Sequence, residues 1–129
     1  MASRFLRLGI PLAAFLVIAS CRQAPIYNVQ TASFVNPAAN VALEERGHQI
    51  KRAGAALGWQ MIDESPGVIR ATISLRSHRA VAEIRYDQTQ FSIRYVDSVN
   101  LNYDGSNIHP NYNGWIQRLE QTIIAQSSV

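Results

Sequence analysis

The hydrophobic pattern of this chain changes its period twice. Between residues 59 and 102, apolar positions alternate with polar ones, as in β-strands that bury one face. On either side of this region, apolar residues recur every three to four positions, as in amphipathic helices. The pattern predicts an α+β fold with a helix, a four-stranded antiparallel meander and a second helix, both helices lying on one face of the sheet.

Turn-forming residues divide the alternating region into four strands. We expect these strands at residues 59–63, 68–76, 79–86 and 90–99. The links between them are Ser65-Pro66-Gly67, Ser77-His78 and residues 87–90. Because such short links join antiparallel neighbours, the strands should pair in chain order.

The register of the last three strands follows from their inward faces. We expect Arg76 to pair with Arg79 and Tyr86 to pair with Phe91, which puts only apolar or aromatic residues on one face. The expected rows are Ile69, Tyr86 and Phe91, then Ala71, Ile84 and Ile93, then Ile73, Ala82 and Tyr95. On the other face, Glu83 would lie favourably opposite Arg94, and Arg70 unfavourably opposite Arg85.

The two helices have different inward faces. The first is expected to begin after Asn40, a suitable N-cap, and to end at Gly58. Its repeating positions are Leu43, Gly47, Ile50, Gly54 and Leu57. The glycines predict close approach to the sheet, with a helix-dimer seam as the alternative. The last helix is expected to begin at Pro110, with an inward face of Tyr112, Trp115, Ile116, Leu119 and Ile123.

The N-terminus has the organisation of a signal peptide. Arg4 and Arg7 precede an apolar run over residues 8–19, which is shorter than the ~20 residues of a membrane-spanning helix. The run ends in Leu16-Val17-Ile18-Ala19-Ser20-Cys21, which resembles the lipobox of bacterial lipoproteins. The resemblance implies cleavage before Cys21 and attachment of lipid, such as palmitate, to it. The alternative is an ordinary secretory signal with a chance cysteine.

Residue 22 is arginine, whereas an aspartate there usually marks retention in the inner membrane of enteric-type bacteria. The resemblance therefore implies an outer-membrane lipoprotein that faces the periplasm. The chain divides into a signal peptide (1–20), a lipidated tether (21–39) and a single α+β domain (40–129). Phe34 and Val35 are too apolar for a fully solvated tether, so we expect them to dock on the domain.

The net charge falls when the signal peptide is removed. The whole chain has twelve Lys and Arg against nine Asp and Glu, a formal charge of +3. Without Arg4 and Arg7, ten basic residues face nine acidic ones, a charge of +1. This balance removes the support for a nucleic-acid partner.

The outward face of the predicted sheet is rich in arginine around a single acid, Glu83. One interpretation is a solvated face, which is normal for a sheet covered on one side only. The other is a binding surface for an acidic envelope protein or an anionic envelope polymer, favoured by the expected like-charge pair. Its candidate contact residues are Arg70, Arg76, Arg85 and Arg94.

A second candidate surface is a ligand cleft between the last helix and the loop before it. We expect Tyr103, His109 and Tyr112 to line this cleft, which could take a small or polymeric envelope ligand. His109 is interpreted first as a capping residue and only second as a catalyst, since no partner accompanies it in sequence. Tyr112 is likewise interpreted first as a core residue.

The C-terminal half also carries a family resemblance. The segments Asn100-Leu101-Asn102-Tyr103 and Ile108-His109-Pro110-Asn111-Tyr112-Asn113-Gly114-Trp115-Ile116 resemble a group of small proteobacterial lipoproteins. The resemblance covers the chain from about the first helix to the last. It implies no activity, cofactor or catalytic residue.

Motifs for catalysis or metal binding are not found in the sequence. The three histidines lack a second His or Cys at ligand spacing, and Asp97, Ser98 and His109 lack the context of a hydrolase triad. We therefore expect no metal, no cofactor and no enzymatic activity. The expected function is that of a lipid-anchored periplasmic binding or scaffolding module. A binder of an envelope ligand is the alternative, and a hydrolase is the least favoured.

Overall fold

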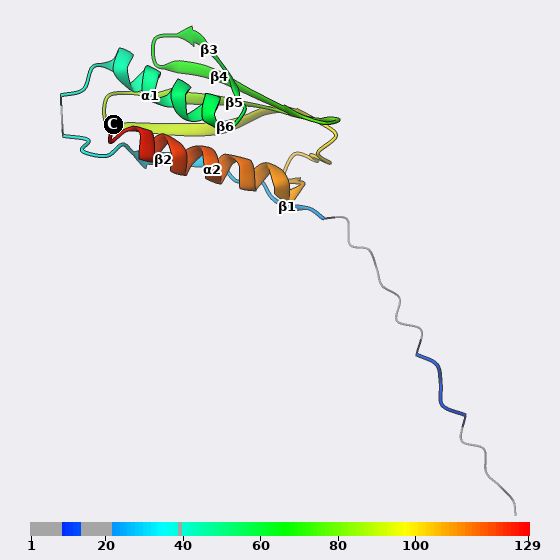
Figure 1. Ribbon diagram of the computed structural model, residues 1–129. Coiled ribbons are helices and arrows are strands. Elements are labelled where there is room, and N and C mark those ends of the chain that lie inside the picture. The colour runs from blue at the N-terminus through cyan, green and yellow to red at the C-terminus, as the bar shows by residue number, and fades with distance from the viewer. Residues whose placement is uncertain (1–8, 14–21, 39) are drawn as a thin grey trace, which may run out of the picture.

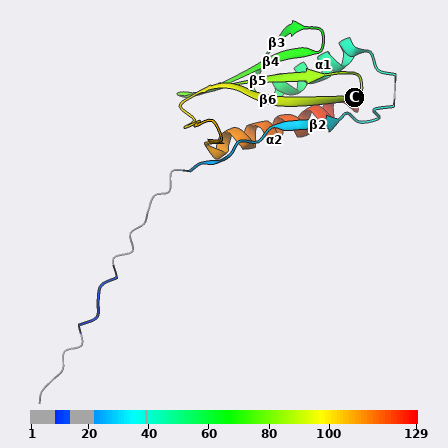
Figure 2. The same cartoon turned by 180° about the vertical axis from the view of Figure 1, so that it is seen from behind.

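Two helices lie on one face of an antiparallel sheet in the computed structural model, which describes residues 9–13, 22–38 and 40–129 (Figure 1). The reverse view shows the opposite face of the sheet, which no described element covers (Figure 2). The expected α+β fold is therefore confirmed. Cys21 and most of the expected signal peptide lie outside the described residues, so lipidation stays a prediction.

The alternating region forms a meander of four strands, β3 to β6. Their bounds are Gln60–Ser65, Val68–Leu75, His78–Tyr86 and Gln90–Val99. A further strand, β2 (Val29–Ser33), pairs with β6 and gives a five-stranded sheet of order β2-β6-β5-β4-β3. Two short strands, β1 (Ala24–Pro25) and β7 (Asn107–Ile108), pair separately. The prediction of a four-stranded sheet therefore missed one edge strand, β2.

The segment expected to be a tether belongs to the folded domain. Val29 and Ala32 pair with β6 across a β-bulge, and both are buried. Phe34 is 2% exposed and its ring centroid lies 5.1 Å from that of Phe91, which confirms that this residue docks. The bulge puts β2's two buried residues three positions apart, so the strand shows no alternation in sequence. The folded domain therefore begins near Gln23 rather than at residue 40.

The register between β5 and β6 is as predicted from Tyr86 opposite Phe91 to Ala82 opposite Tyr95, and it puts Glu83 opposite Arg94. Beyond this point an unpredicted bulge shifts the pairing by one residue, so that Val81 lies opposite Asp97. Between β4 and β5 the predicted register is wrong by two residues. Leu75, rather than Arg76, is the last paired residue of β4, because the chain turns at Arg76 and Ser77, where Arg76 adopts a φ of 57°.

A shift of two residues keeps every side chain on its predicted face, because side chains alternate with period two. It changes their neighbours: Ile69 lies opposite Ile84, and Arg70 opposite Glu83. The predicted like-charge pair of Arg70 and Arg85 therefore does not form.

Helix α1 (Leu43–Ala56) packs closely on the sheet, as its glycines predict. A Cβ added at Gly47 would lie 2.6 Å from the Tyr86 hydroxyl oxygen, and one at Gly54 would lie 2.5 Å from the Met61 sulfur. The helix begins two residues later than expected: Ala42, not Asn40, is the N-cap, and no side chain caps it. Gly58, with a φ of 85°, follows the last turn as expected.

α1 also buries a cation. Arg46 is fully buried, with its guanidinium carbon 4.3 Å from the centroid of the Phe34 ring. Its Nε donates to the Gln88 carbonyl at 2.9 Å, and Nη1 donates to Gln49 Oε1 at 3.1 Å. Nη2 has no hydrogen-bond partner in the described part of the chain. Burial lowers the pKa of this guanidinium, which nevertheless stays charged.

Helix α2 (Pro110–Gln126) closes the core beside α1. The predicted inward face is confirmed for its four fully buried residues, and Trp115 is half-buried. Those four are Tyr112, Ile116, Leu119 and Ile123. His109 is the N-cap, since its Nδ1 accepts a hydrogen bond from the backbone N–H of Asn111 at 3.1 Å, as expected for a capping residue.

Candidate partner-binding surface

The uncovered face of the sheet carries a row across four strands in which three of the four residues are charged. Ile62 of β3 lies opposite Arg70 of β4, which lies opposite Glu83 of β5, which lies opposite Arg94 of β6. The next row contains Arg85. We call Arg70, Glu83, Arg85 and Arg94, together with Glu64, the outer arginine face.

Glu83 is the electrostatic centre of this face. Arg85 Nε donates to Glu83 Oε1 at 2.7 Å, and Arg94 Nη2 lies 4.0 Å from the same oxygen. The hydrogen bond from Arg85 is the main reason why the pKa of Glu83 lies below its usual value, and the charges of Arg94 and Arg70 add to it. The Glu83 side chain is 18% exposed, whereas Arg85 and Arg94 are 61% and 64% exposed.

Two exposed arginines therefore share one carboxylate. Arg70 is paired separately, through a hydrogen bond from its Nε to Glu64. Ion pairs this exposed contribute about 1 kcal/mol or less to stability, so another carboxylate could rearrange them at little cost. The face keeps an excess of positive charge towards solvent.

The outer arginine face is hollowed beside Arg85. A depression of about 370 Å³ lies where β4, β5, β6 and β2 run side by side. It is lined by Arg85 and mostly by polar neighbours that include Gln30, Gln90 and Ser92. Its volume suits one or two side chains of a partner.

Arg76 does not belong to this face, although the sequence grouped it with the other three arginines. It occupies the turn after Leu75, whereas Arg85 lies opposite Val68 at the other end of β4. The seven residue steps between these positions correspond to about 23 Å along the strand. The structure therefore brings Arg70, Arg85 and Arg94 together and leaves Arg76 apart.

The expected ligand cleft contains a packed aromatic cluster. The ring centroid of Tyr95 lies 4.0 Å from that of Tyr103 and 5.6 Å from that of Tyr112. Tyr112 is fully buried, which raises the pKa of its hydroxyl, and this hydroxyl has no partner in the described part of the chain. Tyr112 is therefore a core residue that a ligand could not reach without rearrangement, while Tyr103 is 40% exposed.

Ser98 and His109, which were considered with Asp97 as members of a hydrolase triad, have other hydrogen-bond partners. Ser98 Oγ lies 2.7 Å from the Tyr95 hydroxyl oxygen, and His109 caps α2 through Nδ1. Neither hydrogen bond joins the serine to the histidine. Among the described residues, no group of three or more His, Cys, Asp and Glu is placed to hold a metal ion.

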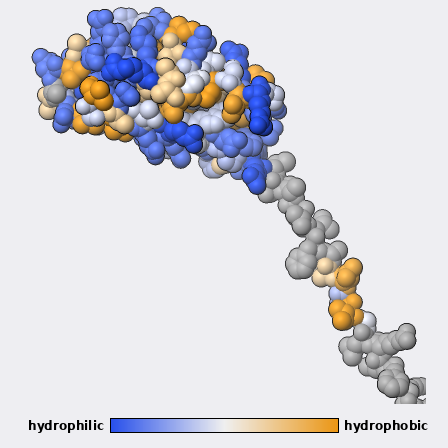
Figure 3. Space-filling view, in the orientation of Figure 1, coloured by the Kyte–Doolittle hydropathy of each residue, from blue (hydrophilic) through white to orange (hydrophobic). Residues whose placement is uncertain are grey.

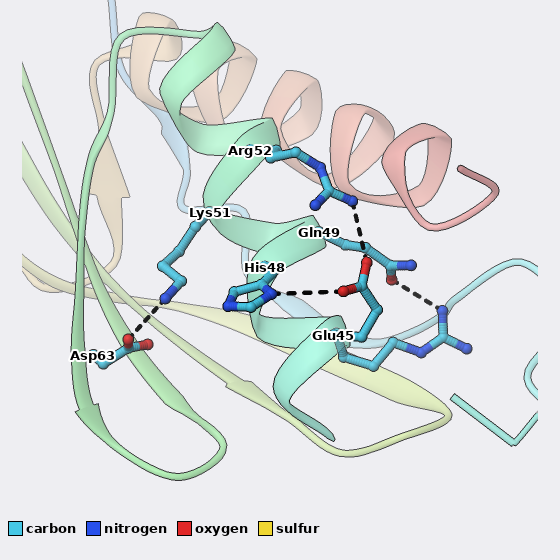
Figure 4. A network of polar contacts seen from close by, with 7 residues as sticks. Glu45, His48, Gln49, Lys51, Arg52 and Asp63 are labelled. Atoms are coloured by element: carbon cyan, nitrogen blue, oxygen red, sulfur yellow. Dashed lines mark hydrogen bonds and ion pairs between the residues drawn. The ribbon is translucent and has the colours of Figure 1, made fainter. Parts of the chain in front are cut away.

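A second hollow, of about 580 Å³, was not expected from the sequence. It lies between α1 and the turn from β3 to β4, with Gly47 and Tyr86 in its lining. The ion pair of Lys51 with Asp63, at 2.8 Å, joins α1 to β3 beside it (Figure 4). The only sequence signal was the pair of glycines, which indicated close packing rather than a hollow.

On α1 itself, Glu45 contacts both His48 and Arg52, at 3.5 and 3.4 Å (Figure 4). The helix-bearing side of the molecule is mostly hydrophilic, with apolar residues in small groups (Figure 3). No helix within residues 9–13, 22–38 and 40–129 is long and apolar enough to cross a membrane. Comparisons with models of protein families, with curated proteins and with solved structures found no match to this chain.

Proposed function

We propose that the chain is an envelope lipoprotein that is anchored in the outer membrane through lipid on Cys21 and faces the periplasm. Its domain binds an acidic segment of an envelope protein through the outer arginine face, without catalysing a reaction. The observation that carries this proposal is the pair of exposed arginines, Arg85 and Arg94, which share the single carboxylate of Glu83 on an uncovered sheet face. The lipobox at residues 16–21 supports the anchor.

Arginine suits this role because its planar guanidinium binds a carboxylate through two parallel hydrogen bonds. A partner carboxylate could take over Arg94, whose contact with Glu83 is long, while Arg85 keeps its hydrogen bond. Ile62, 51% exposed at the end of the same row, adds an apolar contact. The cationic excess would also accelerate encounter with an acidic surface.

The test is site-specific photo-crosslinking in cells, with a photoreactive amino acid at Ile62, which lies at the end of the arginine row and leaves the arginines in place, and a control at Gln121 on α2. We expect position 62 to capture one protein through an acidic peptide, and position 121 not to capture it. The lipid-free Cys21→Ser chain should lose this capture, because it is no longer concentrated at the membrane.

Charge reversal supplies the matched comparison. We expect Arg85→Glu with Arg94→Glu to lower recovery of the partner at least tenfold, and Arg118→Glu on exposed α2 surface to leave recovery unchanged. Circular dichroism would establish that all variants are folded. Unchanged recovery with both arginines reversed would refute the proposed surface.

A small envelope ligand is the second candidate, favoured by the hollow between α1 and the β3–β4 turn. Its volume of about 580 Å³ lies in the range of small-molecule sites, and Lys51 and Tyr86 supply polar groups. Native mass spectrometry of the gently purified protein should then show a retained mass that is lost in Lys51→Ala. A chain that is always free of ligand would argue against this candidate.

A further inference from the structure

The folded domain leaves almost no spacer after Cys21. Gln23 Nε2 donates to the Asn102 carbonyl at 2.7 Å, and Ala24 and Pro25 pair with β7. The backbone N–H of Ile26 then donates to the Ser106 carbonyl at 3.0 Å. Only Arg22 separates Gln23 from Cys21 in the sequence, and a spacer of this length spans at most about 7 Å. A lipid on Cys21 would hold this end of the domain at the bilayer rather than lift it away.

Three segments meet at this end of the molecule. The start of β1 contacts the loop after β6 through Gln23 and Asn102. The same loop contacts the β4–β5 turn, since His78 Nδ1 lies 2.8 Å from the Asn100 carbonyl and Asn100 Nδ2 donates to Ser77 Oγ at 2.9 Å. Figures 1 and 2 show the β4–β5 turn, this loop and β1 at one end of the sheet. We call residues 22–25, 75–79 and 99–106 the anchor-side end.

The anchor-side end exposes apolar side chains. Leu75 and Val99 are each 51% exposed, and Tyr103 is 40% exposed. Elsewhere between residues 22 and 129, the other exposed large apolar residues of the described chain are Ile62, Val96 and Val129. An aromatic and two aliphatic side chains at one end match the composition of membrane-interface surfaces.

Three arginines belong to the segments of the anchor-side end, and one of them, Arg79, lies opposite Val99. Arg22, Arg76 and Arg79 form no ion pair within the described residues. The loop after β6 contains one acid, Asp104. Its carboxylate accepts hydrogen bonds from the backbone N–H groups of Ser106 and Asn107 instead of pairing with an arginine. Asp97 lies further along β6, opposite Val81. The arginines are therefore available to phosphate groups of anionic lipids.

We propose that the anchor-side end is a docking surface for the anionic phospholipid bilayer that holds the lipid of Cys21. This inference rests on the proposed anchor. It orients the whole domain: the ten residues of β6 extend about 30 Å from the membrane side, so that Arg85 and its hollow lie near the far end. The outer arginine face would then stand side-on to the membrane, where a periplasmic partner can reach it.

Fluorescence quenching on the full-length lipidated protein tests this orientation. Because Cys21 is the only cysteine and would carry the lipid, one introduced thiol is the only free one to label. We would label Val99→Cys or Leu75→Cys at the anchor-side end, and Ser65→Cys, exposed in the β3–β4 turn, as the control. The vesicles contain phosphatidylethanolamine, phosphatidylglycerol and a lipid with a quencher just below the headgroup.

We expect at least threefold stronger quenching at positions 99 and 75 than at position 65. Arg76→Glu with Arg79→Glu should lower the quenching at position 99 at least twofold, whereas Arg118→Glu should not change it. Replacing phosphatidylglycerol by neutral phosphatidylcholine should have the same effect as the double reversal, because the surface loses its negative charge.

Intact-mass measurement separates the two proposals. A lipidated chain with equal quenching at all three positions would overturn the docking surface and leave the proposed anchor standing. A chain without the lipid mass would overturn the anchor and the docking surface together. Lipidated protein with the expected quenching pattern supports both, and the crosslinking at position 62 stays an independent test of partner binding.

Discussion

Single residues on the inner face of α1 decide how closely the helix approaches the sheet. Gly54 faces the Met61 side chain, with no space for a Cβ. Gly114, inside α2, has no heavy atom within 4 Å of the position that a Cβ would take. The same substitution at these two helical glycines therefore separates helix propensity from packing.

We predict opposite effects of alanine at these glycines. Gly114→Ala should raise the free energy of unfolding by about 1 kcal/mol, because alanine is the better helix former and has space. Gly54→Ala should lower it by about 1 kcal/mol, because overpacking against Met61 outweighs the same gain. Urea unfolding of the chain from residue 22 measures both. Stabilisation by both substitutions would show that the contact with Met61 is not limiting.

Arg46 shows that a buried cation can be tolerated without a carboxylate partner. Its polar partners are the Gln88 carbonyl and the Gln49 amide, and its plane lies over Phe34. Removing the side chain loses these contacts and opens a cavity, whereas an apolar chain of similar length removes only the buried charge.

We therefore predict that Arg46→Ala lowers the free energy of unfolding by about 3 kcal/mol. Arg46→Met should change it by about 1 kcal/mol or less, because the methionine keeps contact with Phe34 and needs no hydrogen bonds. The measurement is the urea midpoint at a fixed unfolding slope. Equal losses in the two variants would mean that the hydrogen bonds, not the packing, are what Arg46 contributes.

At the scale of elements, regular alternation was the property that made prediction succeed. The register of β6 with β5 was predicted correctly from Phe91 to Tyr95, because the inward residues of β6 there are large and apolar or aromatic. The bulge beyond Tyr95, which leaves Val96 without a partner in β5, was not predicted. Strand β2 was missed, because its bulge breaks the alternation. The register of β4 with β5 was wrong by two residues, because the pattern fixes which face a side chain occupies but not its row, and the turn conformation at Arg76 decides the row.

A truncation tests whether β2 is part of the folding unit. We predict that a fragment of residues 40–129 is much less stable than one of residues 22–129. The fragment loses the pairing of β2 with β6 and the contact of Phe34 with Phe91, and it leaves Arg46 without the ring beneath it. Phe34→Ala alone should cost about 3 kcal/mol.

Circular dichroism in the near ultraviolet and urea unfolding would compare the two fragments. For the single substitution Phe34→Ala, the matched control is Val35→Ala, because Val35 is the neighbouring residue and is only half-buried. If the fragment of residues 40–129 had the same unfolding midpoint as the longer one, β2 would make no contribution to the stability of the domain.

At the scale of the whole molecule, the anchor-side end and the outer arginine face differ in their chemistry. The anchor-side end combines exposed apolar residues with arginines that lack ion pairs in the described part of the chain. The outer arginine face holds its arginines against Glu64 and Glu83. The proposed membrane contact and the proposed partner binding therefore rest on different residues, and each can be tested without the other.

A linker insertion should separate them. We predict that ten Gly and Ser residues between Arg22 and Gln23 lower the quenching of a probe at position 99 at least twofold. A flexible linker of this length has a root-mean-square span of about 17 Å, which lowers the local concentration of the domain at the bilayer. Photo-crosslinking of the partner at position 62 should persist. Undiminished quenching would mean that the anchor-side end binds the bilayer without help from the short spacer.

Sequence alone determined the fold class, the two helices, the four meander strands and the faces of the side chains in β4, in β5 and in β6 as far as Tyr95. These properties follow from local periodicity, because a side chain's face depends only on its position along its own element. Only the tertiary structure decided that β2 completes the sheet, that Arg76 stands apart from the other arginines and that the chain is fastened from Gln23 onwards. These facts depend on contacts between residues distant in sequence, which no periodicity within one segment records.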